Sequence, residues 1–257
     1  MDSYEIVRAK KHKQKKLPKV GNRPEYVDGV RWIGMDIAEF NHKGDVNEMF
    51  AINTHILGTG FYLKNKPFVV TCYHVIAQFL DPVNIQSPHS EQAINDEHRF
   101  RFIKNLLVGN ENGKEKAQIV AMDSKHDLAL LEVQIPESHR KEESAFGFEL
   151  AKDYPKIGER IGYCGYPVAD MLCKESIQPT YAEGAAGSFV QKTKTINKIQ
   201  ISGPIIGGFS GSPIFSRYKQ KIVYGVAYDS FADNATGRSE IFFGVGFEHI
   251  ANLAKCY

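Results

Sequence analysis

The chain has 257 residues and a formal net charge of +2, with 42% hydrophobic and 24% charged residues. This length suits one large all-β domain or two small ones, and the apolar content is enough for a sizeable core. So small a net charge gives the chain no strong overall electrostatic attraction to nucleic acid or membranes. No apolar run is long enough to span a bilayer, so the sequence argues against a membrane partner.

The first segment, residues 1–27, is predicted to be basic and flexible. Pro18, Pro24 and a run of lysines in this segment cannot form a core. Charge occupies the stretch where a signal peptide needs apolar residues, so we expect a cytoplasmic protein. Seven basic residues gather between positions 8 and 19: Arg8, Lys10, Lys11, Lys13, Lys15, Lys16 and Lys19.

The cysteines are expected to be free thiols, because a reducing compartment disfavours disulfides. Their spacing matches no compact zinc-binding pattern, and the sequence therefore predicts no metal site. The four cysteines are Cys72, Cys164, Cys173 and Cys256.

From Val30 onward, short apolar stretches alternate with turn signals such as Lys64-Asn65-Lys66 and Asp233-Asn234. The stretches are rich in Val, Ile, Phe and Tyr, which favour strands, and their close spacing is typical of a sandwich or barrel. The stretches read FAINTHILGTGFYL, PFVVTCYHVI, RFRFIKNLLVG, AQIVAM, DLALLEVQI, RIGYCGYPV, KTINKIQISG, SGSPIF, KIVYGVAYDS and EIFFGVGF.

Helical patterns are sparse. Residues 74–79 are predicted to form one or two turns after a strand, and residues 247–257 place Ile250, Leu253 and Ala254 on one helical face. Residues 138–143, with the sequence SHRKEE, are predicted to form a solvated loop.

Two polar residues lie at the ends of apolar stretches. His74 closes the segment Thr71-Cys72-Tyr73-His74, where a ring at a strand end can project into a cleft. Asp127 stands directly before the apolar run Leu128–Leu131. Taken singly, His74 is also compatible with a structural role, and Asp127 with a turn or cap.

The segment from Gly207 to Pro213 places glycines on both sides of Ser210. Glycine lets the backbone bend sharply and approach a substrate closely. Such a turn can aim the amides of Gly208 and Ser210 at one point, as an oxyanion hole requires. A plain Gly-Ser loop is the alternative, but the apolar residues after Pro213 indicate that a strand resumes at once.

Together these segments resemble the trypsin-like proteases of the chymotrypsin fold. Gly208-Phe209-Ser210-Gly211-Ser212-Pro213 is similar to their nucleophile motif, Thr71-Cys72-Tyr73-His74 to their His motif, and Asp127-Leu128-Ala129-Leu130-Leu131 to their Asp motif. The order His, Asp, Ser is that of chymotrypsin. Leu57–Phe61 resembles a Gly-(Ser/Thr)-Gly-Phe strand of bacterial HtrA-like members, and Tyr224–Tyr228 resembles the strand that lines the cleft.

The resemblance covers about residues 45–252. It implies an all-β fold of two six-stranded antiparallel β-barrels with a short C-terminal helix over residues 28–257, with a boundary between the barrels near 135–150. It further implies a serine endopeptidase with His74, Asp127 and Ser210 as catalytic triad, and with the amides of Gly208 and Ser210 as oxyanion hole. No metal or organic cofactor is implied, and no PDZ domain is expected.

The same resemblance implies a substrate-binding region. The pocket floor of the family lies about six residues before the nucleophile, at Pro204, with Ile205 beside it. Because no Asp stands there, an apolar or small substrate side chain is favoured over Lys or Arg. Tyr228, Asp229 and Ser230 on or near the cleft strand complete the predicted substrate-binding residues.

Three residues depart from the family pattern. Cys72 replaces the usual Ala and is expected to pack in the strand end. Phe209 stands where secreted trypsins carry the Asp that pairs with a newly cleaved N-terminus, so activation by such cleavage is not expected. Ser212 replaces a second Gly.

Other functions stay open at this point. One alternative is a catalytically silent module that binds peptides or partner proteins. The basic segment could also bind nucleic acid through phosphate contacts, although a solvated tail is favoured. A cytoplasmic protease must also be restrained, and a regulatory protein partner is one means.

Overall fold

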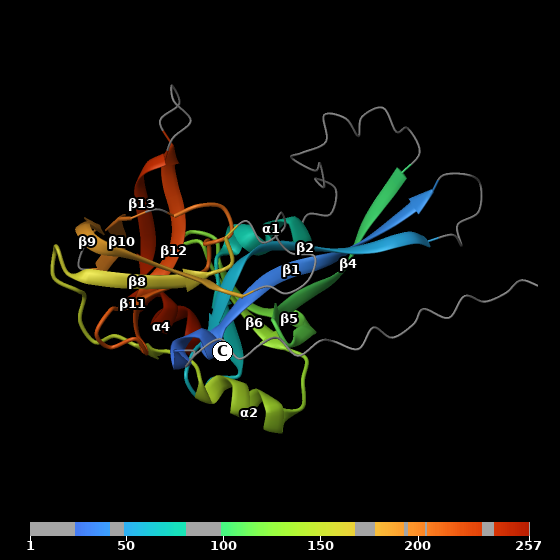
Figure 1. The fold of residues 1–257 in the computed structure, drawn as a ribbon, viewed down its shortest axis with the longest axis horizontal. Coiled ribbons are helices and arrows are strands. Elements are labelled where there is room, and N and C mark those ends of the chain that lie inside the picture. Colours follow the sequence, from blue (N-terminus) through green and yellow to red (C-terminus); the bar gives the residue numbers. More distant parts are fainter. Residues whose placement is uncertain are drawn as a thin grey trace, which may run out of the picture.

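The structure is a computed structural model that describes residues 24–41, 49–80, 99–167, 178–192, 195–203, 205–232 and 239–256. Two barrels lie side by side, the first drawn in blue to green and the second in yellow to red (Figure 1). The helical segments in the described ranges are η1 (Glu25–Gly29), α1 (Tyr73–Leu80), α2 (Glu137–Ala145) and α4 (Phe247–Lys255).

The first barrel is closed, with the strand order β1-β2-β3-β6-β5-β4, and every neighbouring pair is antiparallel. Two neighbouring strands, β3 and β6, read Phe-Val-Val-Thr and Leu-Ala-Leu-Leu-Glu-Val, mainly apolar runs that suit strands buried on both faces. Its strands are β1 (Val30–Asn41), β2 (Met49–Tyr62), β3 (Phe68–Thr71), β4 (Arg99–Asn110), β5 (Gly113–Asp123) and β6 (Leu128–Val133).

The second barrel runs β11-β8-β9-β10-β13-β12 and closes through the β11–β12 pair, again with antiparallel neighbours. A short strand, β7, adds to β12 in parallel. The predicted fold of two six-stranded antiparallel barrels is therefore confirmed. The strands are β7 (Glu149–Leu150), β8 (Arg160–Gly165), β9 (Thr180–Lys192), β10 (Thr195–Ser202), β11 (Pro213–Ser216), β12 (Ile222–Ala232) and β13 (Ser239–Gly246).

Both predicted helices are present. α1 covers the predicted residues 74–79, and the C-terminal helix α4 buries Ile250 and Leu253 on the expected face. Among the described residues, no helix combines the length and the apolar content needed to cross a membrane.

The prediction of a solvated loop at residues 138–143 is wrong, because this stretch lies within helix α2. The helix begins after Pro136, whose fixed φ suits a helix start. Glu137 and Lys141 form an ion pair of 2.8 Å one helical turn apart, and charged residues with long side chains are good helix formers. The run is polar on nearly every side, so it lacks the apolar periodicity that would have indicated a helix.

The N-terminal segment is described only from Pro24 onward. Residues 1–23 lie outside the described residues, so their flexibility stays a prediction. Val27, in η1, is buried and belongs to the apolar core that fills the first barrel and its junction with the second. The buried core thus includes at least one residue before β1.

Candidate active site

His74 and Asp127 are held together by two contacts. The Asp127 Oδ1 accepts the backbone N–H of His74 at 2.8 Å, and Oδ2 lies 2.7 Å from Nδ1 of its ring. One carboxylate therefore fixes both the main chain and the imidazole. Because the carboxylate accepts from Nδ1–H, the lone pair of the neutral ring lies on Nε2, the nitrogen that a general base uses. The His74 side chain is 48% exposed, so the ring is accessible.

The turn that carries Asp127 has an unusual backbone. It spans residues 124–127 between β5 and β6, and Asp127 has a φ of +54°. Asp and Asn are the non-glycine residues that adopt this left-handed region most readily. The Asp127 carbonyl also accepts the backbone N–H of Tyr73 at 3.1 Å. This turn is thus tied directly to the start of α1.

Asp123 stabilises the same turn. Its Oδ1 accepts the backbone N–H groups of Lys125 and His126, each at 3.1 Å, and its Oδ2 lies 2.6 Å from Nδ1 of His126. Burial alone would raise the pKa of Asp123, but the hydrogen bonds from His126 hold that pKa below its usual value. The His126 ring stacks on His249 of α4, with centroids 4.0 Å apart. Sequence reasoning missed this packing, which joins residues distant in the chain.

The segment before Ser210 forms a tight turn. The Phe209 N–H donates to the Ile206 carbonyl at 3.0 Å, and Gly208 has a φ of +96°. A positive φ at the third residue defines a type II turn, which calls for glycine. A Cβ at Gly208 would lie 2.3 Å from the Tyr166 carbonyl oxygen, so sterics and backbone conformation both require glycine there.

Gly211 completes the turn after Ser210. It has a φ of +92°, and its N–H donates to the Ala227 carbonyl at 2.7 Å. A Cβ at this position would lie 1.8 Å from the Thr59 carbonyl oxygen. Gly211 therefore lets the chain at Ser210 lie directly against β2 of the first barrel, whereas Gly208 lets it pass close to Tyr166.

The main chain of Ser210 and Val75, the residue after His74, both lie close to Gly58 of β2. A Cβ on Gly58 would come 2.8 Å from Val75 of α1 and 2.9 Å from the Ser210 carbonyl. The Ser210 hydroxyl donates to the Tyr228 carbonyl at 3.4 Å, longer than an ordinary O–H···O bond. Within the described ranges, no hydrogen bond joins Ser210 to His74. The structure thus pairs two predicted triad members directly and places the third on the adjoining glycine turn.

Thr59 is the main connection between the first barrel and this turn, and it is fully buried. Its N–H donates to the Ser210 carbonyl at 2.8 Å, and its hydroxyl donates to the Gly208 carbonyl at 2.7 Å. The same hydroxyl accepts the Tyr166 N–H at 2.9 Å, and the Thr59 carbonyl accepts from the Thr71 hydroxyl at 2.6 Å. From the sequence, Thr59 was singled out only as part of the segment Leu57–Phe61.

Replacing Thr59 with valine is expected to destabilise the protein by about 1–3 kcal/mol, because it keeps the shape of the side chain but leaves buried groups at Gly208 and Tyr166 unpaired. Urea unfolding measures the loss. Thr59→Ser keeps the hydroxyl and serves as the matched control. If the valine variant were to unfold at the same urea concentration as the wild type, the bridging role of Thr59 would be refuted.

The predicted substrate-binding residues are only partly described. Ile205 is buried and Tyr228 is partly buried. Asp229 and Ser230 lie in β12, where their backbones pair with β13. Pro204, and the side chains of Asp229 and Ser230, lie outside the described residues. The substrate preference therefore stays a prediction.

The structure shows the surroundings of two residues that depart from the family pattern. Phe209 is buried, and its ring packs edge-on against Tyr163 at 5.4 Å between centroids, so an apolar contact takes the place of an ion pair. Cys72 is fully buried, and its Sγ lies 3.4 Å from the Ala227 carbonyl. Cys72, Cys164 and Cys256 are free thiols, whereas Cys173 lies outside the described residues.

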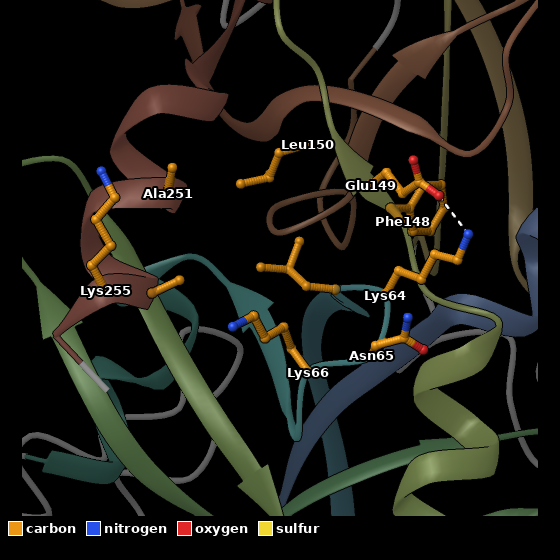
Figure 2. Close-up of a pocket in the computed structure, with 10 residues that line it drawn as sticks. Lys64, Asn65, Lys66, Phe148, Glu149, Leu150, Ala251 and Lys255 are labelled. Carbon is orange, nitrogen blue, oxygen red and sulfur yellow. Dashed lines mark hydrogen bonds and ion pairs between the residues drawn. The ribbon is translucent and has the colours of Figure 1, made fainter.

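A separate cavity of about 500 Å³ lies between the turn after β2, strand β7 and helix α4. Figure 2 shows Leu150 and Ala251 pointing into it and Lys64 paired with Glu149, at 2.5 Å. Its lining contains none of the residues predicted for catalysis or substrate binding. This cavity is therefore distinct from the candidate active site.

Two β-barrels that carry a paired His and Asp on the first and a glycine-flanked Ser on the second define a chymotrypsin-type fold. The profile of the family described as "Trypsin-like peptidase domain" matches residues 58–226, more than half of the chain. The chain belongs to this family.

Solved structures agree on the fold. The HtrA-type protease AlgW, solved with a decapeptide, gives a TM-score of 0.62 at 16% identity over 89% of this chain and 64% of that one. The active form of the Rv3671c protease from M. tuberculosis gives a TM-score of 0.54 at 17% identity, over 90% of this chain and 81% of that one. HtrA-type proteases are thus among the structural neighbours, as the Gly-Thr-Gly-Phe segment suggested.

One curated relative is the uncharacterized protein y4bJ of Sinorhizobium fredii. It is 25% identical over 161 residues, which are 63% of this chain and 20% of that protein. The aligned part of this chain thus spans about a fifth of that relative's length.

Proposed function

We propose that this protein is a serine endopeptidase, with Ser210 as nucleophile, His74 as general base and Asp127 as the residue that orients the base. The observation that carries the proposal is the Asp127 carboxylate, which binds both the main chain and Nδ1 of His74. That arrangement leaves Nε2 to accept a proton. Membership in the trypsin-like peptidase family and the glycine turn at Ser210 support the same assignment.

Hydrolysis begins with a rotation of the Ser210 hydroxyl away from the Tyr228 carbonyl toward Nε2 of His74. The bond that it leaves is 3.4 Å long and therefore weak, so the rotation costs little. Ser210 Oγ then attacks the scissile carbonyl while His74 takes its proton and passes it to the leaving amine. Water, activated by the same ring, hydrolyses the acyl-enzyme, and Asp127 stays ionised throughout.

The amides of Gly208 and Ser210 are proposed to stabilise the oxyanion of the tetrahedral intermediates. The type II turn, with φ of +96° at Gly208, fixes the orientation of the peptide that carries the Gly208 N–H. Thr59 holds the carbonyls of both residues and so restrains the turn on either side. An oxyanion hole that is set before the substrate arrives costs no reorganisation during the reaction.

The substrate class is an extended peptide or a protein segment. AlgW was solved with a decapeptide, and that likeness supports peptide binding in the corresponding cleft of this chain. An apolar or small side chain is the proposed preference, because Ile205 is buried next to the expected pocket floor. We also propose a cytoplasmic location and a regulatory protein partner.

A fluorophosphonate probe tests this function, because it reacts only with an activated serine. The wild type is expected to be labelled at Ser210, and Ser210→Ala is expected to lose all labelling. Ser212→Ala is the matched control, since this buried serine lies in the same turn. Absence of labelling in a folded wild type, with retained peptide binding, would instead support a catalytically silent peptide-binding module.

A further inference from the structure

Three side chains of the kinds that bind metal ions lie close together at the proposed active site. Atoms of Cys72, His74 and Asp127 that can bind a metal all lie within 4.8 Å of one another. They come from the residue after β3, the first turn of α1 and the β5–β6 turn. Thiolate, imidazole and carboxylate are the ligands that zinc takes in proteins. We propose that this cluster binds one Zn²⁺ ion reversibly and that the bound ion switches off hydrolysis.

The distances suit zinc after small side-chain movements. Zinc bonds of about 2.0–2.3 Å place neighbouring ligand atoms about 3–4 Å apart. The Asp127 Oδ2 and His74 Nδ1 now lie 2.7 Å apart and must separate slightly, whereas Cys72 Sγ lies no farther than 4.8 Å from either ligand and must approach. The proposal requires rotations of these three side chains, and Cys72 Sγ must leave its present contact with the Ala227 carbonyl. Because the His74 side chain is 48% exposed, the ion enters from its side, and water takes the fourth position.

Cys72 decides which metal the cluster prefers. Mg²⁺ and Ca²⁺ require oxygen ligands, so a thiolate at one corner disfavours them. His74 and Asp127 belong to the proposed triad, whereas Cys72 has no role in the proposed hydrolysis. The thiol is therefore the ligand whose removal tests the metal site without removing a proposed catalytic group.

Zinc binding removes the general base without contact to the nucleophile. The Cys72 thiol loses its proton to solvent when its sulfur binds the ion. If Nδ1 of His74 binds zinc, the ring proton moves to Nε2, which then cannot accept a proton from Ser210. Because Oδ2 of Asp127 lies 2.7 Å from Nδ1, Nδ1 is the ring nitrogen that can share an ion with this carboxylate. Asp127 then becomes a metal ligand and no longer orients the ring.

Cobalt titration of the full chain tests the site, because a cobalt–thiolate bond gives an intense near-ultraviolet absorption. The wild type is expected to bind one Co²⁺ with this absorption, and Zn²⁺ is expected to displace it. Cys72→Ala should lose the absorption and bind Zn²⁺ at least about a hundredfold more weakly. Cys164→Ala, which removes another buried free thiol, is the matched control and should behave as the wild type.

A second measurement follows the effect on hydrolysis, with each variant compared with its own metal-free rate. Zn²⁺ is expected to inhibit the wild type and Cys164→Ala, but Cys72→Ala only at about a hundredfold higher concentration. Equal zinc affinity in the wild type and Cys72→Ala, or cobalt binding without the thiolate absorption, would overturn the proposal. Cys72→Ser, which keeps the volume of the side chain, replaces Cys72→Ala if that variant does not fold.

The regulatory effect rests on the proposed function, but the metal site does not. A wild type that shows the cobalt–thiolate absorption but no labelling by a fluorophosphonate keeps the metal site and refutes the peptidase. A wild type that is labelled at Ser210 but binds no cobalt keeps the peptidase and refutes the metal site.

Discussion

Asp127→Asn is expected to lower kcat by about 10⁴-fold while the chain stays folded. The asparagine amide can donate to Nδ1 of His74, which favours the tautomer with the proton on Nε2 and removes the base. Asn tolerates a φ of +54° well, so the turn itself is retained. Hydrolysis of a fluorogenic peptide gives kcat, and thermal unfolding verifies the fold.

The matched control is Asp123→Asn in the same region. Asp123 contacts the ring of His126 as Asp127 contacts the ring of His74, at 2.6 Å and 2.7 Å between the respective atoms. Its replacement should reduce stability far more than kcat. Equal losses of kcat in the two variants would show that general disturbance of the turn, and not the His74 tautomer, explains the effect.

Gly208→Ala is expected to lower kcat/KM by about 10²–10³-fold, the usual consequence of losing one donor of an oxyanion hole. A methyl group there meets the Tyr166 carbonyl at 2.3 Å, and an L-residue disfavours a φ of +96°. The turn must therefore rearrange, and the Gly208 N–H leaves its position. The measurement combines kcat/KM with the affinity for a peptide aldehyde, which forms a tetrahedral adduct with the serine.

Gly207→Ala is the control for this change. An added Cβ at Gly207 meets no atom within 4 Å, and its φ lies outside the positive range. This variant should retain both kcat/KM and aldehyde affinity. If Gly208→Ala kept its aldehyde affinity while Gly207→Ala lost it, the oxyanion hole would have to be assigned to other groups.

Much of the fold could be predicted because strands such as β3 and β6 have their apolar residues next to one another in the sequence. β3 and β6 each begin with at least three consecutive apolar residues, and such runs favour a buried position. β9 could not be predicted in this way, because Thr180–Lys192 contains Ala and Gly at its centre, which have low strand propensity. Its strand conformation comes from pairing with β8 and β10, which sequence reasoning does not see.

In the candidate site, too, some residues could be predicted from the sequence and others could not. Short motifs predicted His74, Asp127 and Ser210 as site residues, because each motif is contiguous in the sequence. The role of Thr59 could not be predicted, since its hydroxyl binds a carbonyl 149 residues away, at Gly208. The proximity of Cys72 to His74 and Asp127 was missed for a related reason. Spacing rules for metal sites compare cysteines with one another, and here a single cysteine meets an Asp that is distant in the sequence.

The Thr59 contacts bear on when a newly made chain could first assemble the proposed active site. The first barrel supplies His74, Asp127 and Thr59, whereas the second supplies Ser210, so neither barrel alone holds all the residues of that site. A chain still on the ribosome, with residues beyond about 200 not yet emerged, lacks the proposed nucleophile. Under the proposed function, such a chain would hydrolyse no protein before its second barrel has emerged.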